Sequence, residues 1–205
     1  MNHCLRIRAV FLLCFSFAVA SQLSAADTDA GLLGRNYVGT DLFIEHVRTA
    51  NISDGLGGAL TGNFAVAPHF DLGATASLER FSDFSIRDDR LGVYARGFTE
   101  VSGFRPFADL SLGGTWQSST FDGVTHRSND GIYGVAFGVE APVAKSTALF
   151  GRLGYNKYFD SKNGHYWLYS LGLNHWLTPQ LNLGASVSFQ DSDSVTYKLH
   201  VVLGF

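Results

Sequence analysis

Polar and apolar residues alternate at every second position through long stretches of this chain, and this pattern most restricts how it can fold. In residues 70–79 (FDLGATASLE), apolar Phe70 and Leu72 alternate with Asp71 and Gly73. Residues 181–190 (LNLGASVSFQ) repeat the alternation. A period of two over this length indicates β-strands with one apolar face and one polar face.

The four prolines divide the chain into repeats. Pro68, Pro106, Pro142 and Pro179 are separated by 38, 36 and 37 residues. Proline cannot donate to a strand ladder, so its regular spacing indicates regular turns between strands. Each repeat has room for a hairpin of two strands. The ten predicted strands are residues 36–47, 55–66, 70–81, 90–99, 105–116, 131–142, 147–158, 165–176, 181–190 and 195–205.

The length of these strands indicates which face is inside. At about 11 residues they are long enough to cross a bilayer at a tilt, whereas strands of soluble sheets average about five or six residues. Backbone amides cannot face hydrocarbon unpaired, so such a sheet must close on itself. We therefore expect an all-β fold, a single closed antiparallel up-and-down transmembrane β-barrel of ten strands, with eight as the alternative. The competing interpretation is a soluble lipocalin-like barrel with an apolar interior.

The first 26 residues have the features of a signal peptide. Arg6 and Arg8 precede the apolar run 9–20, and small residues follow at 24–26. The predicted domain is then residues 27–205. Cys4 and Cys14 both lie in the removable segment, and no long basic block remains, so nucleic acid is not an expected partner.

The end of the chain carries a second pattern. Apolar or aromatic residues occupy every other position and finish on a phenylalanine; they are Tyr197, Leu199, Val201, Leu203 and Phe205. This pattern resembles the C-terminal signature of bacterial outer-membrane β-barrels such as the OmpA, OmpX and OmpW types. The resemblance implies a Gram-negative outer membrane, recognition of these five residues by the barrel assembly machinery, and contact with membrane lipid and lipopolysaccharide.

Aromatic residues of the lipid-facing register are predicted to form two girdles. The girdle near the loop ends comprises Trp116, Tyr133, Tyr155, Trp167, Phe189 and Tyr197. The girdle near the proline turns comprises Phe64, Phe70 and Phe205.

Charged residues of the opposite register should line the lumen and form cross-strand ion pairs, because buried ions persist only when paired. The predicted lumen network comprises Asp41, Glu45, Asp71, Glu79, Arg96, Asp109, Glu140, Arg152, Lys198 and His200. A narrow barrel filled in this way predicts a structural or surface-interaction role with a plugged lumen. A narrow porin for small solutes is the alternative.

One short motif raises an enzymatic alternative. The stretch His126-Arg127-Ser128-Asn129 is similar to the His-x-Ser-Asn motif of the lipid A deacylase family PagL, and Glu140 follows at a matching spacing. In that family a Ser nucleophile, a His base and a Glu form a triad. Residues 131–139 read here as one unbroken strand, which would separate Glu140 from Ser128, so no catalytic residues are assigned.

Other sites find little support in the sequence. The seven histidines are scattered without the spacing of metal ligands, so neither a metal nor a cofactor is expected. The remaining candidates for interaction are the surface loops, predicted at residues 48–54, 82–89, 117–130, 159–164 and 191–194.

Overall fold

The structure is a computed structural model that describes residues 30–48, 54–82, 85–160, 164–191 and 193–205. The predicted signal peptide, residues 1–26, lies outside the described residues. Within the described part of the chain, no helix is long and apolar enough to cross a membrane.

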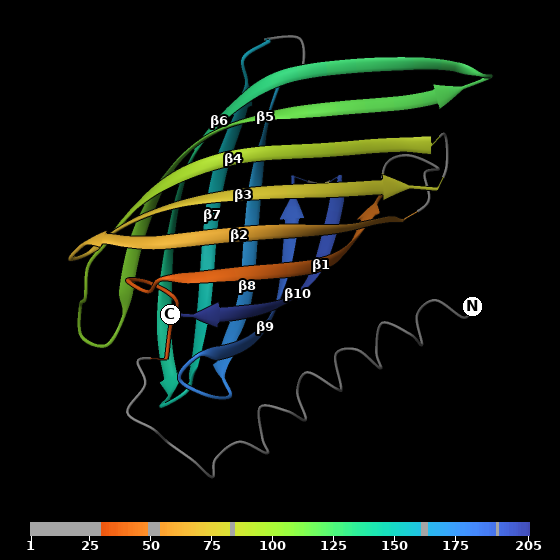
Figure 1. Ribbon diagram of the computed structural model, residues 1–205. Helices are drawn as coiled ribbons and strands as arrows, with labels where there is room; N and C mark the ends of the chain where they lie inside the picture. Colours follow the sequence, from red (N-terminus) through yellow and green to blue (C-terminus); the bar gives the residue numbers. More distant parts are fainter. Residues whose placement is uncertain (1–29, 49–53, 83–84, 161–163, 192) are drawn as a thin grey trace.

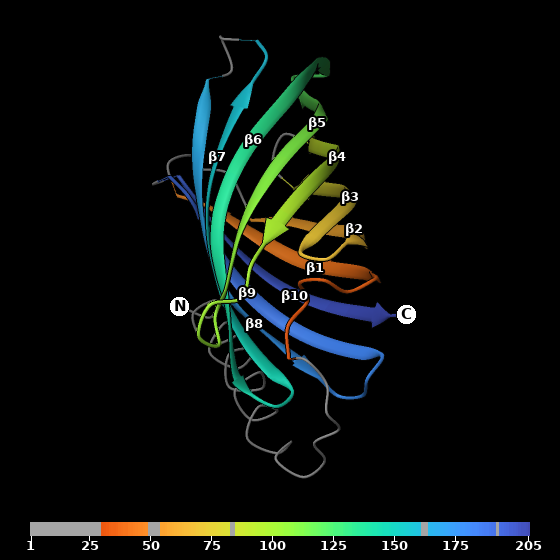
Figure 2. The same ribbon diagram turned by 90° about the vertical axis from the view of Figure 1, so that its left-hand side faces the viewer.

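The described residues form ten antiparallel strands in a closed up-and-down barrel (Figure 1). Closure joins β1 to β10, from Tyr37 opposite Gly204 to Val47 opposite Ser194; these two strands lie side by side in Figures 1 and 2. The ten-strand prediction is confirmed, and the eight-strand alternative is wrong. The strands are β1 (Tyr37–Val47), β2 (Gly55–Ala67), β3 (Phe70–Phe81), β4 (Ile86–Phe98), β5 (Arg105–Phe121), β6 (Val124–Ala144), β7 (Thr147–Tyr158), β8 (His165–Trp176), β9 (Leu181–Gln190) and β10 (Ser194–Gly204).

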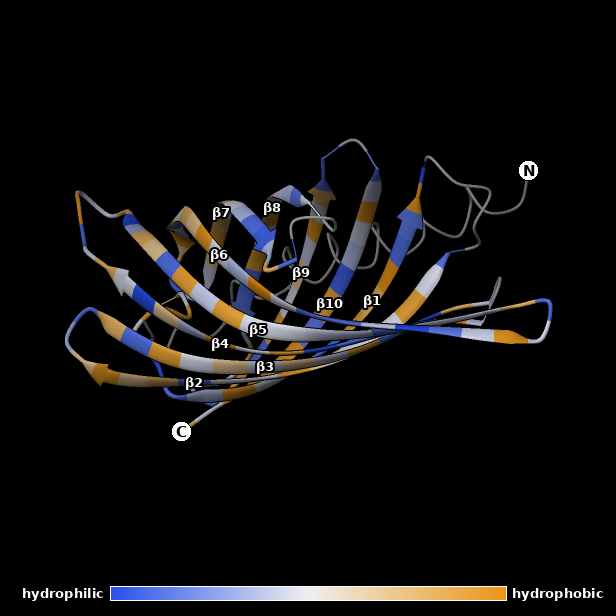
Figure 3. Cartoon of the chain, turned by 90° about the horizontal axis from the view of Figure 1, so that it is seen from above, coloured by the Kyte–Doolittle hydropathy of each residue, from blue (hydrophilic) through white to orange (hydrophobic). Residues whose placement is uncertain are grey.

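The outer face of the barrel is apolar. Alternating apolar and polar bands run along the strands in Figure 3. Large exposed apolar side chains project outward along β1 to β8 and β10, and many keep more than half of their surface exposed, as Leu42, Leu110, Phe137 and Leu171 do. In water such a surface would be an extreme hydrophobic patch, but against acyl chains it is the expected exterior.

The inner face is polar. The side chains of Asn63, Asp71, Asp109 and Asn182 are almost completely buried, and all four belong to the inward register of their strands. The expected orientation, with apolar residues toward lipid and polar residues in the lumen, is confirmed. The soluble alternative with an apolar interior is wrong.

The two ends of the barrel differ. The proline turns leave short connections, such as residues 68–69 and 145–146, and β1 begins and β10 ends on this side. Most connections at the opposite end are longer. In transmembrane barrels of this type the short turns are periplasmic and the longer loops are extracellular, and we name the two ends accordingly.

The β5–β6 connection departs from the sequence prediction. Residues 117–130 were expected to be a loop, but β5 continues to Phe121 and β6 starts at Val124, so the hairpin extends past the end of β4 (Figure 1). Asp122 and Gly123 form the tight turn with φ of 49° and 76°. Two successive positive φ values match the twist of a two-residue hairpin, and Asp-Gly adopts them readily.

Aromatic residues lie near both ends of the apolar surface. At the extracellular end, the rings of Tyr155 and Trp167 are 5.0 Å apart. At the periplasmic end, Phe64 and Phe205 meet edge to face at 6.2 Å. Aromatic rings at these two depths fit membrane–water interfaces.

The lipid-facing assignment predicts a position-dependent effect of charge on β5. Leu110 projects outward near the middle of the strand and is 67% exposed. Leu110→Arg should destabilise the barrel folded in lipid vesicles by about 2–4 kcal/mol, because arginine is costly at the bilayer midplane. Urea unfolding followed by tryptophan fluorescence measures the change. Thr120→Arg, on the same face but in the protruding hairpin, is the control and should be nearly neutral; equal losses would contradict the orientation.

Candidate functional site

The centre of the lumen is occupied by one acid held between two arginines. Arg96 of β4 donates from Nε to Asp109 Oδ1 at 2.6 Å and from Nη2 to Oδ2 at 3.1 Å. Arg152 of β7 donates to the same Oδ2 at 3.2 Å. Asp109 is on β5 and Arg152 is on β7, so the hydrogen bond from Arg152 crosses β6. Ala136 and Gly138 of β6 lie between the two side chains, and their small size leaves room for this contact.

Aromatic rings surround this group. The Arg96 guanidinium lies 5.2 Å from the centre of the Tyr94 ring and 4.9 Å from that of Phe107. Cation–π contacts of this kind stabilise a desolvated guanidinium. The middle of the barrel is therefore filled by packed ionic and aromatic side chains.

A second set joins the first and last strands. Lys198 of β10 pairs with Asp41 of β1 at 3.3 Å and lies above the Phe43 ring. His200 Nε2 and Asn174 Oδ1 are 2.6 Å apart. Closure of the barrel is what brings Lys198 beside Asp41, because the two residues are far apart in the sequence.

Polar residues also converge at the extracellular end. Arg90 donates to Asp88 Oδ2 from Nε at 3.0 Å and from Nη2 at 2.6 Å, and Thr115 Oγ1 donates to Asp88 Oδ1 at 2.9 Å. Glu79, which is almost fully buried, interacts with Glu45 from across β2. This level of the lumen is therefore richer in acids than in bases.

The periplasmic end is closed by a segment that precedes the first strand. Residues 30–36 fold against the barrel, and Ala30 and Leu33 are buried. The Leu32 N–H donates to Glu140 Oε2 at 2.8 Å, and the Gly34 N–H donates to Asp71 Oδ2 at 3.1 Å. We call residues 30–36 the N-terminal plug.

Side chains from the barrel hold the plug at its carbonyl groups. Trp176 Nε1 donates to the Gly31 carbonyl at 3.2 Å, and Asn63 Nδ2 donates to the Arg35 carbonyl at 2.8 Å. The Arg35 guanidinium lies 4.4 Å from the centre of the Trp176 ring. The contacts come from opposite sides of the barrel, since Asn63 is on β2 and Trp176 is on β8.

Gly31 shows how closely the plug approaches the wall. Arg105 and Glu140 form a buried ion pair between β5 and β6. A Cβ on Gly31 would overlap both side chains, so only glycine fits against this pair. The ion pair thus forms part of the plug's binding surface.

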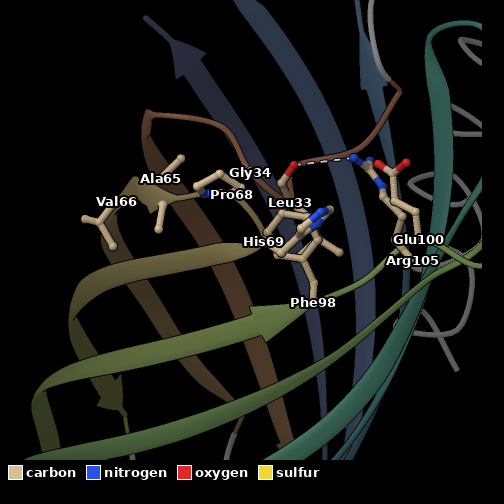
Figure 4. A pocket seen from close by; sticks show the side chains of 10 residues that line it. Leu33, Gly34, Ala65, Val66, Pro68, His69, Phe98, Glu100 and Arg105 are labelled. Atoms are coloured by element: carbon tan, nitrogen blue, oxygen red, sulfur yellow. Dashed lines mark hydrogen bonds between the residues drawn. The ribbon is translucent and has the colours of Figure 1, made fainter.

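A pocket of about 500 Å³ lies beside the plug at the periplasmic end. Leu33, Gly34, Pro68, His69 and Phe98 contribute to its lining (Figure 4). Arg105 also borders the pocket, but its Nη1 donates to the Leu33 carbonyl at 3.4 Å and its guanidinium is paired with Glu140. Its cationic group is therefore committed to holding the plug.

The structure places the ten predicted lumen residues as follows. All of them belong to the inward register, and the side chains of Arg96, Asp109 and Arg152 form one group. Asp41 pairs with Lys198, and Glu45 with Glu79. Asp71 and Glu140 bind the plug, and His200 contacts Asn174.

Sequence reasoning missed several charged lumen residues, among them Asp88, Arg90, Arg105 and Arg35. Asp88 and Arg90 were assigned to a loop or its edge, whereas β4 begins at Ile86 and turns both inward. Arg105 is the first residue of the predicted strand 105–116 but was not included in the predicted network, and Arg35 precedes the first predicted strand. For Asp88 and Arg90 no signal was present, because residues 87–90 are four consecutive charged residues without apolar alternation.

The deacylase-like residues do not come together. His126, Ser128 and Glu140 all lie on β6, which is continuous from Val124 to Ala144. Twelve residues of extended strand place Ser128 about 40 Å from Glu140, and Glu140 is paired with Arg105. Among the described residues, no three His, Cys, Asp or Glu side chains are grouped as a metal site would require.

The predicted assembly residues share one face. Tyr197, Leu199, Val201 and Leu203 belong to the outward register of β10, and Phe205 follows the strand with 69% of its surface exposed. They are accessible from the lipid side. Their recognition by the assembly machinery stays a prediction.

The shared carboxylate predicts that Asp109 contributes strongly to stability. Asp109 is buried, and Asp109→Asn would leave two partly buried guanidinium groups, those of Arg96 and Arg152, without their anion, so it should lower the free energy of unfolding in detergent by about 3 kcal/mol. Asp41→Asn is the matched control. Its partner Lys198 is about one-third exposed, so the loss should be about 1 kcal/mol or less. Thermal unfolding followed by circular dichroism compares the two, and similar losses would contradict the central role of Asp109.

Comparison with known proteins returns only distant structural matches. No protein-family model matches the sequence, and no curated protein matches it significantly. Neisserial surface protein A is 13% identical with a TM-score of 0.46, over 83% of this chain and 97% of that one. The β domain of the Bordetella autotransporter BrkA is 12% identical with a TM-score of 0.49, over 86% and 100%. The KdgM porin is 14% identical with a TM-score of 0.41, over 83% and 98%.

These sequence identities and TM-scores are too low to transfer a role from the matched proteins to this chain. The fold is therefore assigned from the structure of the chain itself. A closed antiparallel sheet removes free edges, its exterior is apolar along all ten strands, and its interior is polar and charged. The chain therefore has the fold of an outer-membrane β-barrel protein.

Proposed function

We propose that this protein is a closed-lumen barrel of the bacterial outer membrane with a structural and surface-interaction role. The observation that carries the proposal is the N-terminal plug, which bonds to Glu140, Asp71, Asn63 and Trp176 around the periplasmic end. Behind the plug, the group centred on Asp109 fills the middle of the lumen. A solute would have to displace both layers to cross.

A narrow pore is the second candidate, and one feature favours it. A recess of about 170 Å³ opens at the extracellular end of the lumen, lined by Thr115, Gln117, Ser128, Asp130 and Tyr158. Its polar lining would admit water and small polar solutes. The recess ends above the level of Asp109, so a pore would also need movement of the Arg96–Asp109–Arg152 group.

The closed-lumen proposal predicts the electrical behaviour of the purified barrel. Protein refolded from detergent into planar lipid bilayers should show no sustained conductance steps, because the packed ionic layers leave no continuous water path. Asp109→Ala with Arg96→Ala, which empties the middle level, serves as the comparison and should conduct more than the native protein. Sustained porin-like steps from the native protein would favour the pore.

The surface-interaction part of the proposal draws support from the protruding hairpin. Residues 119–126 extend past the last β4–β5 pair, which is Arg87 with Ser118, and their tip carries the exposed apolar side chains of Phe121 and Val124. A two-stranded ribbon that projects from the membrane presents both backbone edges and an apolar tip to a partner. The export signal predicted at residues 1–26 is consistent with delivery to the cell surface.

Labelling of intact cells tests this placement. Cys4 and Cys14 both lie in the predicted signal peptide, so a single introduced cysteine should be the only thiol of the exported barrel. Thr125→Cys, on the hairpin, should react with a membrane-impermeant maleimide on whole cells. Lys145→Cys, in a proline-end turn, should react only after the outer membrane is opened. Labelling in the reverse order would overturn the assigned orientation.

A further inference from the structure

Three arginines form one row across the outer face of the barrel at its extracellular rim. Arg80 of β3 is opposite Arg87 of β4, Arg87 is opposite Ser118 of β5, and Ser118 is opposite Arg127 of β6. The row thus spans four adjacent strands, and three strand spacings place Arg80 and Arg127 about 14 Å apart at the backbone. The side chains of Arg80 and Arg87 are 46% and 52% exposed.

The row lies directly above the apolar surface. The next outward-facing row toward the membrane centre contains Leu78, Asp89, Trp116 and Asn129. Leu78 and Trp116 are exposed on the lipid side. One outward step along a strand is about 7 Å, so the guanidinium groups are placed at the depth of lipid headgroups while Leu78 and Trp116 below them contact acyl chains.

Two of the arginines are held in position by a shared acid. Arg80 Nη1 donates to Asp89 Oδ1 at 2.8 Å, and Arg87 Nε donates to Asp89 Oδ2 at 2.6 Å. Arg80 Nη1 also donates to the Glu79 carbonyl at 2.7 Å. Asp89 is only 18% exposed, so it lies beneath the two guanidinium groups. With Arg127 included, the row retains two net positive charges.

We propose that this row is a binding surface for lipid A, the phosphorylated anchor of lipopolysaccharide. Lipid A is a disaccharide with a phosphate at each end and acyl chains below, and the row offers a fixed Arg80–Arg87 pair, a separate Arg127 and an apolar surface underneath. Guanidinium groups bind phosphate through paired hydrogen bonds. A glycerophospholipid has one phosphodiester and would engage only one end of the row. The proposal concerns the outer face and is independent of whether the lumen conducts.

Binding of defined lipids to the purified barrel in detergent tests the proposal. Native mass spectrometry would compare diphosphoryl lipid A, monophosphoryl lipid A and phosphatidylglycerol. The native barrel should retain the diphosphoryl form about tenfold more tightly than the monophosphoryl form, because one charge-assisted contact is lost with the second phosphate. Phosphatidylglycerol that competes as well as diphosphoryl lipid A would overturn the proposal.

Variants that remove one positive charge inside or outside the row distinguish specific binding by the row from nonspecific electrostatic attraction to the extracellular end. Arg127→Gln should weaken diphosphoryl lipid A about tenfold and leave the monophosphoryl form nearly unchanged. Arg48→Gln removes the same charge at the same end of the barrel but outside the row, and it should have little effect. Equal weakening by Arg127→Gln and Arg48→Gln would overturn the proposal, and heat-modifiable gel migration verifies that each variant is folded.

Discussion

The pairing of every backbone amide within the hydrocarbon layer is the constraint on which the rest of this structure depends. An unpaired N–H or C=O group in lipid costs several kcal/mol, so a membrane-spanning sheet cannot keep a free edge. The ladder between β1 and β10 satisfies this constraint along the whole of both strands. Once the cylinder is closed, strand alternation assigns every side chain either to lipid or to the lumen.

Closure of the barrel places charged side chains in a narrow interior, where an unpaired charge is energetically costly. Charged groups in a narrow lumen must find partners, and here they do so across strands, as Asp109 does with Arg96 and Arg152. Small residues on the intervening β6 make such long reaches possible. Polar interactions therefore replace the hydrophobic core of a soluble domain, while the hydrophobic surface faces outward.

The two ends of the barrel differ in the groups that they carry. At the periplasmic end, main-chain N–H groups of the N-terminal plug each donate to one oxygen of Glu140 and of Asp71, two acids that face the lumen. At the extracellular end, β5 and β6 continue beyond their neighbours, and three arginines form a row on the outer face of β3 to β6 above Leu78 and Trp116. The periplasmic end is thus occupied by a segment outside the strands, whereas the extracellular end presents groups carried by the strands themselves.

Alternation and proline spacing determined the ten strands, the barrel and the orientation of its faces, because a period of two is a local property that each strand carries by itself. The boundaries of β3, β7, β8 and β9 follow directly from it. The β5–β6 hairpin was missed although Asp122-Gly123 is a strong hairpin signal, since the polar composition of residues 117–130 was read as a loop.

Only the tertiary structure decided which charges meet, and it did so through register and closure. Closure of the last strand on the first was enough to expect Lys198 near Asp41, but nothing local in the sequence brings Arg152 to Asp109 across β6 or aligns Arg80, Arg87 and Arg127 in one row. The plug was equally hidden, because residues 30–36 have no strand periodicity and are ordered by groups that arrive from β2, β3, β6 and β8. The alternation along a strand determines whether a side chain faces lipid or the lumen. Which lumen side chains contact each other depends instead on the register of strands that are distant in the sequence but adjacent in the closed barrel.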